Sequence, residues 1–192
     1  VSRRLWRVGL LAPAETGLRE VATPFLNDLH AATRATLHLA VRDRYEVLYL
    51  ERLSGRTSVP VVSTVGTRLP MHSTGVGKVL LAYGGQDLQD AVLGSLDRYT
   101  DSTITDAPTL KAQLLTIRSQ GFAVTREELA PGATSVAVPL RGKGGTVIAA
   151  LGVVSSSDNA EISRMVPVLQ VTAAALSKKL AQSGLGEASR LQ

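Results

Sequence analysis

Helical and strand-like periodicities divide the chain into distinct segments. Apolar residues recur every three or four positions over residues 18–32 and 162–180, a spacing typical of amphipathic helices with one buried face. We expect Thr16 to cap the first of these helices, and Pro24 to kink it or delay its start.

Extended segments joined by turns account for much of the remaining chain. Strands are expected at residues 36–41, 46–53, 59–63, 122–125, 135–140 and 146–154. The first two strands and the last two are each joined by a short turn, so each pair predicts a hairpin. Shorter helices are expected between the hairpins, at residues 74–82, 87–93 and 107–120, the last capped by Thr105 or Asp106 and stopped by Gly121.

The order of these elements indicates the fold class. Hairpins dominate and no alternation of strand and helix is sustained, which favours an α+β fold with a central antiparallel sheet of about six strands and helices packed on it. The length of 192 residues suits a single domain. We place that domain at residues 18–182, between a linker-like segment at 1–17 and a frayed tail at 183–192.

The most informative segment is residues 69–82, LPMHSTGVGKVLLA, in which two glycines open an apolar helix. Gly75 and Gly77 have no Cβ atom, so a ligand or another stretch of backbone can approach them closely. The unpaired N–H groups at a helix start, together with the helix dipole, attract small anions such as carboxylates. Two interpretations stay open from this spacing: an anion-binding turn, or a capped helix packed tightly on a sheet.

Several other kinds of site are disfavoured. The chain has no cysteine, which excludes disulfides and thiolate metal sites and indicates a reducing cytoplasm. The glycine segment has neither the spacing of a P-loop nor that of the Gly-x-Ser-x-Gly hydrolase turn, so nucleotide binding and serine catalysis are not expected. His30, His38 and His72 share no metal-ligand spacing, and we expect no metal and no cofactor.

Charged residues add little specific chemistry. The net charge of +5 is dispersed without a basic run, so we expect a solvated surface and no sequence-specific DNA binding by this domain. Lys78 is expected to pair with an acid such as Asp87, and Glu127 and Glu128 to be solvated or to cap a turn. No apolar run is long enough to span a membrane.

Two motifs and the strands after them resemble one known family. Residues 69–78, LPMHSTGVGK, resemble the LP-[LM]-H-[AS]-[ST]-[AG]-x-G-K segment of IclR-type transcription regulators. Residues 121–132, GFAVTREELAPG, resemble the GYAxDxEE-x-x-x-G segment of that family, and residues 135–140 and 149–153 resemble its next two strands. The resemblance runs over residues 18–180 and is limited to the family's C-terminal, effector-binding domain, which has a GAF-like fold.

The resemblance implies a pocket on the concave side of the sheet, where a small anionic effector accepts backbone hydrogen bonds at the start of the glycine helix. Carried over to this chain, that places the effector's carboxylate at Gly75 and Val76. The other implied pocket residues are Thr125, Ala133, Ser135, Gly152 and Val154, with Ser58, Val59, Val61 and Met71 as a second group.

Three positions depart from the family's pattern. Thr125 stands where the family has an acid, and Gly152 and Val154 stand where it often has small hydroxyl residues. A buried polar ligand group without its partner costs about 1–3 kcal/mol, which makes the smallest hydroxy acids and dicarboxylates less suitable ligands. We therefore expect an effector acid that is larger and partly apolar or aromatic.

These expectations combine into one function and two alternatives. The resemblance implies the effector-sensing domain of a bacterial transcription regulator, without enzymatic activity, in the cytoplasm and assembled as a dimer or tetramer. DNA binding would belong to a winged helix-turn-helix domain, which in the family precedes this one and which these residues do not include. The alternatives are a stand-alone GAF-like ligand-binding module and a GAF-like enzyme.

Overall fold

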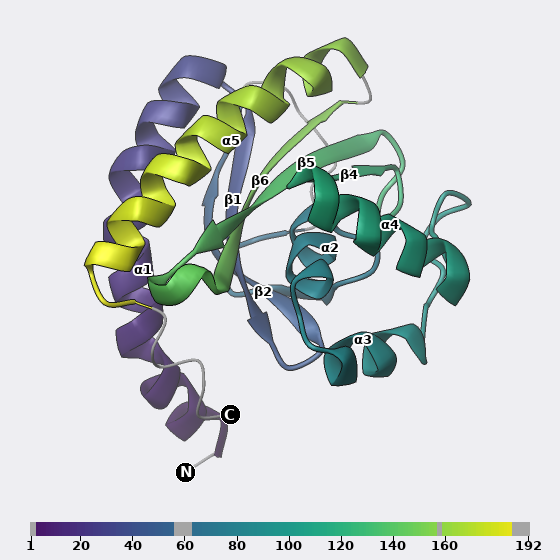
Figure 1. The fold of residues 1–192 in the computed structure, drawn as a ribbon, viewed down its shortest axis with the longest axis horizontal. Coiled ribbons are helices and arrows are strands. Elements are labelled where there is room, and N and C mark those ends of the chain that lie inside the picture. Colours follow the sequence, from purple (N-terminus) through teal and green to yellow (C-terminus); the bar gives the residue numbers. More distant parts are fainter. Residues whose placement is uncertain (1–2, 56–62, 157–158, 186–192) are drawn as a thin grey trace.

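The computed structural model describes residues 3–55, 63–156 and 159–185 of the chain (Figure 1). Its helices are α1 (Arg3–Thr33), α2 (Gly75–Ala82), α3 (Gln86–Leu93), α4 (Ala107–Gln120) and α5 (Asn159–Gln182), with a short 3-10 turn at Lys143–Gly145. Its strands are β1 (Thr36–Asp43), β2 (Glu46–Leu53), β3 (Arg68–Pro70), β4 (Ala123–Arg126), β5 (Ala133–Arg141) and β6 (Val147–Ser156).

The strands of the described residues form one antiparallel sheet in the order β3-β2-β1-β6-β5-β4. Both expected hairpins, β1–β2 and β5–β6, are present, and pairing of β1 with β6 joins them at the centre of the sheet. The predicted α+β class with a central antiparallel sheet is confirmed.

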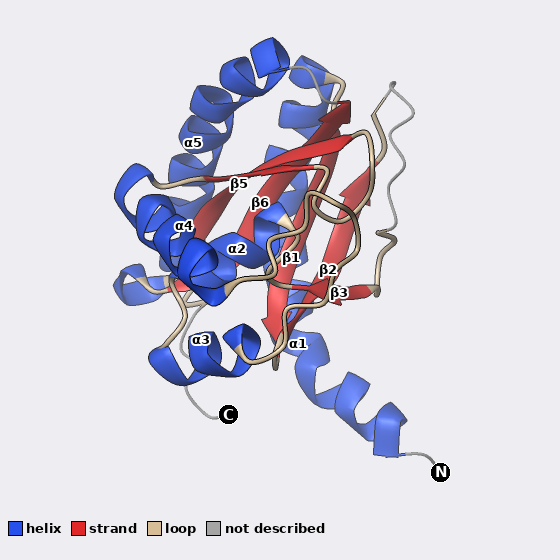
Figure 2. Ribbon diagram, turned by 90° about the vertical axis from the view of Figure 1, so that its right-hand side faces the viewer, coloured by secondary structure: helices blue, strands red, loops and turns tan. Residues whose placement is uncertain are grey.

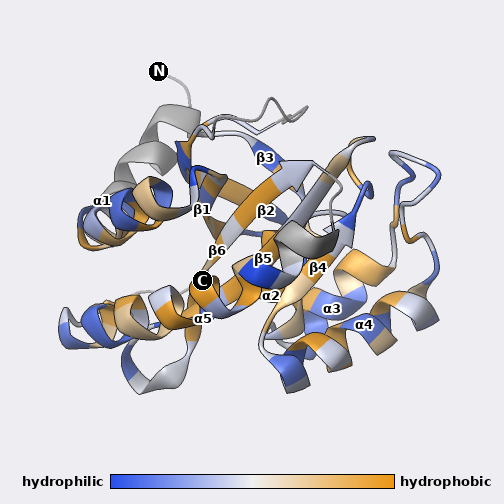
Figure 3. Ribbon diagram, turned by 90° about the horizontal axis from the view of Figure 1, so that it is seen from above, coloured by the Kyte–Doolittle hydropathy of each residue, from blue (hydrophilic) through white to orange (hydrophobic). Residues whose placement is uncertain are grey.

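Helices cover both faces of this sheet. α1 and α5 lie side by side on one face, and α2 lies on the other with α3 and α4 around it (Figure 2). The buried apolar side chains accordingly form two clusters, and hydrophobic strands lie between the two helical layers (Figure 3). Strand alternation separates the clusters, because Leu37 and Leu39 of β1 point toward α1 and α5, whereas Ala40 points toward α2.

Small side chains on one face of the sheet allow α2 to lie very close to it. Ala137 of β5 and Ala150 of β6 belong to the cluster beneath α2, and Gly152 continues the same row on β6. A Cβ atom at Gly152 would lie 2.8 Å from Cγ1 of Val76, so even an alanine there would displace the helix or the valine. The first turn of α2 is therefore seated directly on the central strands.

The ends of α2 and α4 follow from their local sequences. The Thr74 hydroxyl caps α2 by accepting a hydrogen bond from the Gly77 N–H at 3.2 Å, and it donates to the Pro70 carbonyl at 2.8 Å. Of the two expected caps of α4, Asp106 is the correct one. Gly121 ends α4 with φ of 80°, a left-handed conformation that favours glycine.

The structure corrects the predicted elements at two points. α1 begins at Arg3, so Thr16 is exposed within the helix and does not cap it, and Pro24 does not delay its start. Apolar periodicity detects only the part of α1 that packs on the sheet, and the first turns extend beyond it (Figure 1). The edge strand β3 is too short for alternation to reveal it, and the expected strand at 59–63 falls outside the described residues except for Ser63, which is not in a strand.

The close contact between Gly77 and the segment that precedes α2 gives a prediction. We expect Gly77→Ala to lower the free energy of unfolding by roughly 1–3 kcal/mol or more, because the added Cβ atom would lie 2.5 Å from backbone atoms of Met71 and against the Thr74 hydroxyl. Urea denaturation followed by circular dichroism measures the change. Gly94→Ala is the control, since its Cβ atom would meet only ordinary contacts at 3.5 Å. Equal stability of the two variants would contradict this close contact between Gly77 and the backbone of Met71.

Candidate functional site

A half-enclosed cavity of about 60 Å³ lies between the sheet and the first turn of α2. The loop after β4 and the residues just before α2 complete its walls. The described residues that line it are His38, Tyr49, Ser63, Leu69, Ser73, Thr74, Gly75, Val76, Thr125, Leu129, Ala130, Ala133, Thr134, Ser135, Val136, Gly152, Val153 and Val154.

Two rows of cross-strand neighbours supply the floor of this cavity through all their members except Thr36 and Ala137. Residues directly opposite each other on adjacent strands point to the same face of a sheet. The register therefore aligns two rows across the strands, Thr125–Ser135–Val154–Thr36 and Ala137–Gly152–His38. Polar side chains consequently stand at both ends of the floor, and Gly152 and Val154 make its centre apolar.

The first polar end faces the start of α2. Gly75 is so close to β5 that a Cβ atom on it would lie 2.6 Å from the Ser135 hydroxyl oxygen. The Ser135 hydroxyl in turn lies 2.5 Å from that of Thr125, and either can be the donor. The first N–H groups of a helix have no partner inside the helix, and the helix dipole adds positive potential there. This end of the cavity is suited to a carboxylate.

The second polar end is built by His38 and Ser63, which are both buried. The His38 Nε2 atom lies 2.8 Å from the Ser63 hydroxyl oxygen, and the Tyr49 ring meets the imidazole edge-on with a centroid distance of 5.0 Å. Burial lowers the pKa of His38 to about 3, and the charge of nearby Arg52 acts in the same direction. The imidazole is therefore neutral at physiological pH, and this end of the cavity carries hydrogen-bonding groups without a charge on them.

Ser73 contributes a further hydroxyl to the wall of the cavity. Its side chain is 1 % exposed, and its oxygen has no hydrogen-bond partner among the described residues. Buried hydroxyl groups are nearly always hydrogen-bonded in folded proteins. The unpaired Ser73 oxygen beside a cavity therefore indicates that a ligand or a water molecule supplies the missing partner.

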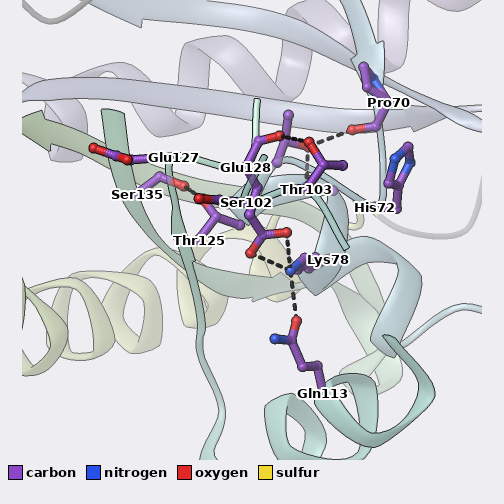
Figure 4. A network of polar contacts seen from close by, with 12 residues as sticks. Pro70, His72, Lys78, Ser102, Thr103, Gln113, Thr125, Glu127, Glu128 and Ser135 are labelled. Carbon is purple, nitrogen blue, oxygen red and sulfur yellow. Dashed lines mark hydrogen bonds and ion pairs between the residues drawn. The ribbon is translucent and has the colours of Figure 1, made fainter. Parts of the chain in front are cut away.

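A buried ion pair fixes the loop that borders the cavity. Lys78 of α2 is fully buried, and its ammonium donates to both oxygens of Glu128, at 2.7 and 2.6 Å, and to the Gln113 side chain at 2.7 Å (Figure 4). Burial lowers the pKa of Lys78 and raises that of Glu128, while the opposite charge of each partner counteracts these shifts. The prediction that Lys78 pairs with Asp87 is therefore wrong, and so is the prediction that Glu128 is solvated. The fold brings together Lys78 and Glu128, which lie fifty positions apart in the sequence.

Hydroxyl groups hold the same loop from a second side. Thr100 and Thr103 donate to the main-chain carbonyls of Glu127 and Glu128, each at 2.6 Å. The Glu127 carboxylate accepts a hydrogen bond from the Gly132 N–H at 3.1 Å, so the expected turn-capping role is correct for this residue. The two residues after Glu128 line the cavity, and their position therefore depends on these contacts.

The structure brings most of the expected pocket residues to one place. Those that line the cavity are Gly75, Val76, Thr125, Ala133, Ser135, Gly152 and Val154. Met71 is buried in the core beneath α2 and does not line the cavity. Ser58, Val59 and Val61 lie outside the described residues.

Six polar lining residues are absent from the expected set: His38, Tyr49, Ser63, Ser73, Thr74 and Thr134. His38 carries a signal in the sequence, because it is a polar residue between apolar neighbours in a strand. The register that sets it beside Gly152 cannot be read from the sequence, and neither can the return of the chain that brings Ser63 to it.

The other histidines have ordinary structural roles. The His30 Nδ1 atom lies 3.0 Å from the Ala35 carbonyl, and the His72 Nε2 atom lies 2.9 Å from the Asp97 carbonyl. Within the described ranges, no group of histidine and acidic side chains could hold a metal ion. Among the same residues, no helix has the length and apolar character needed to cross a membrane.

Comparison with known proteins identifies relatives over most of the chain. The sequence profile of the bacterial transcriptional regulator IclR C-terminal family matches residues 12–178. The HTH-type transcriptional regulator XynR of Escherichia coli is 34% identical over 168 residues, which is 85% of this chain and 67% of XynR. This chain spans half to two thirds of the length of the first curated relatives that it matches.

Solved structures share the fold. An IclR homologue from Microbacterium hydrocarbonoxydans, crystallised in complex with 4-hydroxybenzoate, has a TM-score of 0.84 and 34% identity over 94% of this chain and 75% of its own. The IclR protein of Thermotoga maritima has a TM-score of 0.80 and 29% identity, over 91% of this chain and 74% of its own.

The buried ion pair predicts a strong asymmetry between single and double variants. We expect Lys78→Met to lower the free energy of unfolding by about 3–5 kcal/mol, because the Glu128 carboxylate would stay buried without its partner. The double variant Lys78→Met, Glu128→Leu should recover much of this loss. Chemical denaturation of the three proteins measures the coupling. A single variant as stable as the wild type would show that the pair does not tie the loop to α2.

The neutral His38 predicts a loss of stability in acid. The folded state holds the His38 pKa near 3, whereas the unfolded chain takes up the proton at about 6.5, so protonation favours unfolding as pH falls between these values. Replacing His38 with glutamine should flatten the pH dependence of the unfolding free energy in this window, by up to about 1.4 kcal/mol per pH unit. Denaturation at a series of pH values tests this, and identical slopes would contradict a buried, neutral His38.

Proposed function

This chain belongs to the IclR family of bacterial transcriptional regulators, through that family's C-terminal domain, and we propose that its cavity binds a small carboxylic acid as effector. The observation that carries the proposal is the placement of the α2 N-terminus at the end of the cavity that also holds the Thr125–Ser135 hydroxyl pair. Because Gly75 has no Cβ atom, its backbone lies directly against the Ser135 hydroxyl, so that helix N–H groups and a hydroxyl are available to a carboxylate at the same end of the cavity.

An acid with a partly apolar body suits the remainder of the cavity. Gly152, Val154 and Val76 offer it apolar surface, and burial of that surface contributes roughly 25 cal/mol per Å². The Microbacterium homologue that binds 4-hydroxybenzoate supports an aromatic acid by analogy. The cavity of about 60 Å³ is smaller than the roughly 150 Å³ cavity that accommodates benzene, so a ring requires the surrounding side chains to move.

Effector binding would act on transcription through a change in conformation. A ligand that binds one arrangement of the loops or subunits more tightly shifts the population toward it. In the proposed full regulator, this shift reaches a DNA-binding domain outside these residues, in the cytoplasm, and homo-oligomerisation couples the subunits. Residues 1–17 would serve as the connection, since α1 runs through them from Arg3.

Catalysis is the weaker alternative, although the cavity contains a serine beside a histidine. A serine nucleophile needs a base whose pKa lies near the working pH. The pKa of about 3 makes His38 a poor base, and none of the described carboxylates is hydrogen-bonded to its ring. The pair is therefore better suited to recognition, and the named relatives are regulators.

Carboxylate binding at the start of α2 predicts the effect of a single methyl group. We expect the wild-type chain to be stabilised against heat more by benzoate and hexanoate than by glyoxylate or pyruvate at equal concentration. Gly75→Ala should weaken the binding of benzoate and hexanoate by roughly tenfold or more, because the Cβ atom would lie 2.6 Å from the Ser135 hydroxyl oxygen and would displace this group from the proposed carboxylate site. Thermal-shift and calorimetric titrations measure both effects.

Gly85→Ala is the matched control for this experiment. Gly85 stands at the start of the neighbouring helix α3, and a Cβ atom there would have no neighbour within 4 Å. We expect this variant to bind as the wild type does. Unchanged binding by folded Gly75→Ala would place the carboxylate elsewhere, and stabilisation by two- and three-carbon acids alone would contradict the apolar body.

A further inference from the structure

The cavity has two polar ends of different character. At one end, the first turn of α2 and the Ser135 hydroxyl offer partners for a negative charge. At the other end, His38 and Ser63 are hydrogen-bonded to each other, and His38 is neutral because burial lowers its pKa to about 3. The apolar centre between them is formed by Gly152 and Val154 of β6.

The strand order sets the separation of these ends. Ser135 lies on β5 and His38 on β1, with β6 between them. Neighbouring strands are about 4.8 Å apart, and His38 lies two residues along β1 from Thr36, which is in register with Ser135. The two side chains therefore leave the sheet about 12 Å from each other. A ligand with one ring or a few carbons between two polar groups can reach both ends.

The chemistry of the second end selects the group that binds there. One hydrogen is shared between the His38 Nε2 atom and the Ser63 oxygen, so the serine keeps either a free O–H donor or a free lone pair, depending on the imidazole tautomer. Either arrangement complements a hydroxyl or carbonyl group. A second carboxylate would face a neutral imidazole and a neutral hydroxyl, with no compensating cation on the lining residues at this end.

We propose that His38 and Ser63 form a second recognition site, which binds a neutral hydroxyl or carbonyl group on the end of the effector opposite its carboxylate. The effector class is then a hydroxy or oxo acid in which an apolar body separates the two groups. This inference rests on the proposed function, because the carboxylate site orients the ligand toward His38.

Arg52 carries a positive charge close to His38, and this charge could favour a second carboxylate on the ligand. It is the cross-strand partner of His38 on β2, so its side chain leaves the same face of the sheet. Its Nε atom is buried without a partner among the described residues, although Arg52 is not part of the cavity lining. If this guanidinium governed the second end, a dicarboxylate would be the preferred ligand.

Three para-substituted benzoates distinguish these possibilities by calorimetry. 4-Hydroxybenzoate and 4-methylbenzoate have nearly the same shape but differ in the hydrogen-bonding group, and terephthalate carries a second carboxylate. We expect the wild-type chain to bind 4-hydroxybenzoate roughly tenfold more tightly than 4-methylbenzoate, and terephthalate least tightly. Ser63→Ala should remove the preference by weakening only 4-hydroxybenzoate.

Two further variants make this result specific. Ser155→Ala removes another buried serine hydroxyl, outside the cavity, and should keep the wild-type preference. Ser63→Cys preserves the volume of the site with a much weaker hydrogen-bonding group, so it should lose the preference as well. It replaces Ser63→Ala if circular dichroism shows that the alanine variant does not fold.

The outcomes separate this inference from the proposed function. Equal affinity of the wild type for the hydroxy and methyl compounds would overturn the second site and leave the carboxylate site standing. Preference for terephthalate would assign the second end to Arg52 and also overturn the inference. Binding of no benzoate, hexanoate, glyoxylate or pyruvate would overturn both proposals.

Discussion

The direct packing of α2 on the sheet is the constraint on which the other features depend. The helix can approach because the strands beneath it present Ala137, Ala150 and Gly152 instead of branched side chains. Gly75 makes the same close approach possible from the side of the helix, whereas Gly77 allows the backbone of Met71, just before the helix, to lie against it. With this packing, the N-terminal turn of α2 lies against the surface of the sheet. The cavity is the space between that turn and the strands.

The ion pair between Lys78 and Glu128 holds the loop after β4 in place as a wall of the cavity. A buried pair of charges is seldom a large source of stability, because desolvation offsets much of the attraction. Its geometry is nevertheless demanding, and here it holds the loop after β4 against α2 while two threonine hydroxyls hold the loop's carbonyls. The same helix therefore supplies both the anion-attracting end and the anchor of the loop that borders the cavity.

The proposed effector site separates two kinds of recognition along the sheet. A helix N-terminus provides partial positive charge without a basic side chain, which suits a carboxylate that must also leave again. The neutral His38 on β1 offers a directional hydrogen bond at the other end of the cavity without adding a charge. Thr125 stands where the family's motif has an acid, so one end of the floor carries hydroxyl groups. The His38 imidazole stands at the other end, with Gly152 and Val154 between the two.

The sequence by itself determined the order and type of most elements, because alternation and helical spacing are local properties of the chain. The glycine spacing also indicated the α2 turn, and the resemblance of its motifs to IclR-type segments implied seven residues that line the cavity. Only the tertiary structure decided which groups meet across long separations. Lys78 finds Glu128 and not Asp87, and His38 meets Ser63, because strand register and loop path set these distances. No local sequence pattern predicts that register. The polar groups at the His38 end of the cavity can therefore be identified only from the assembled sheet.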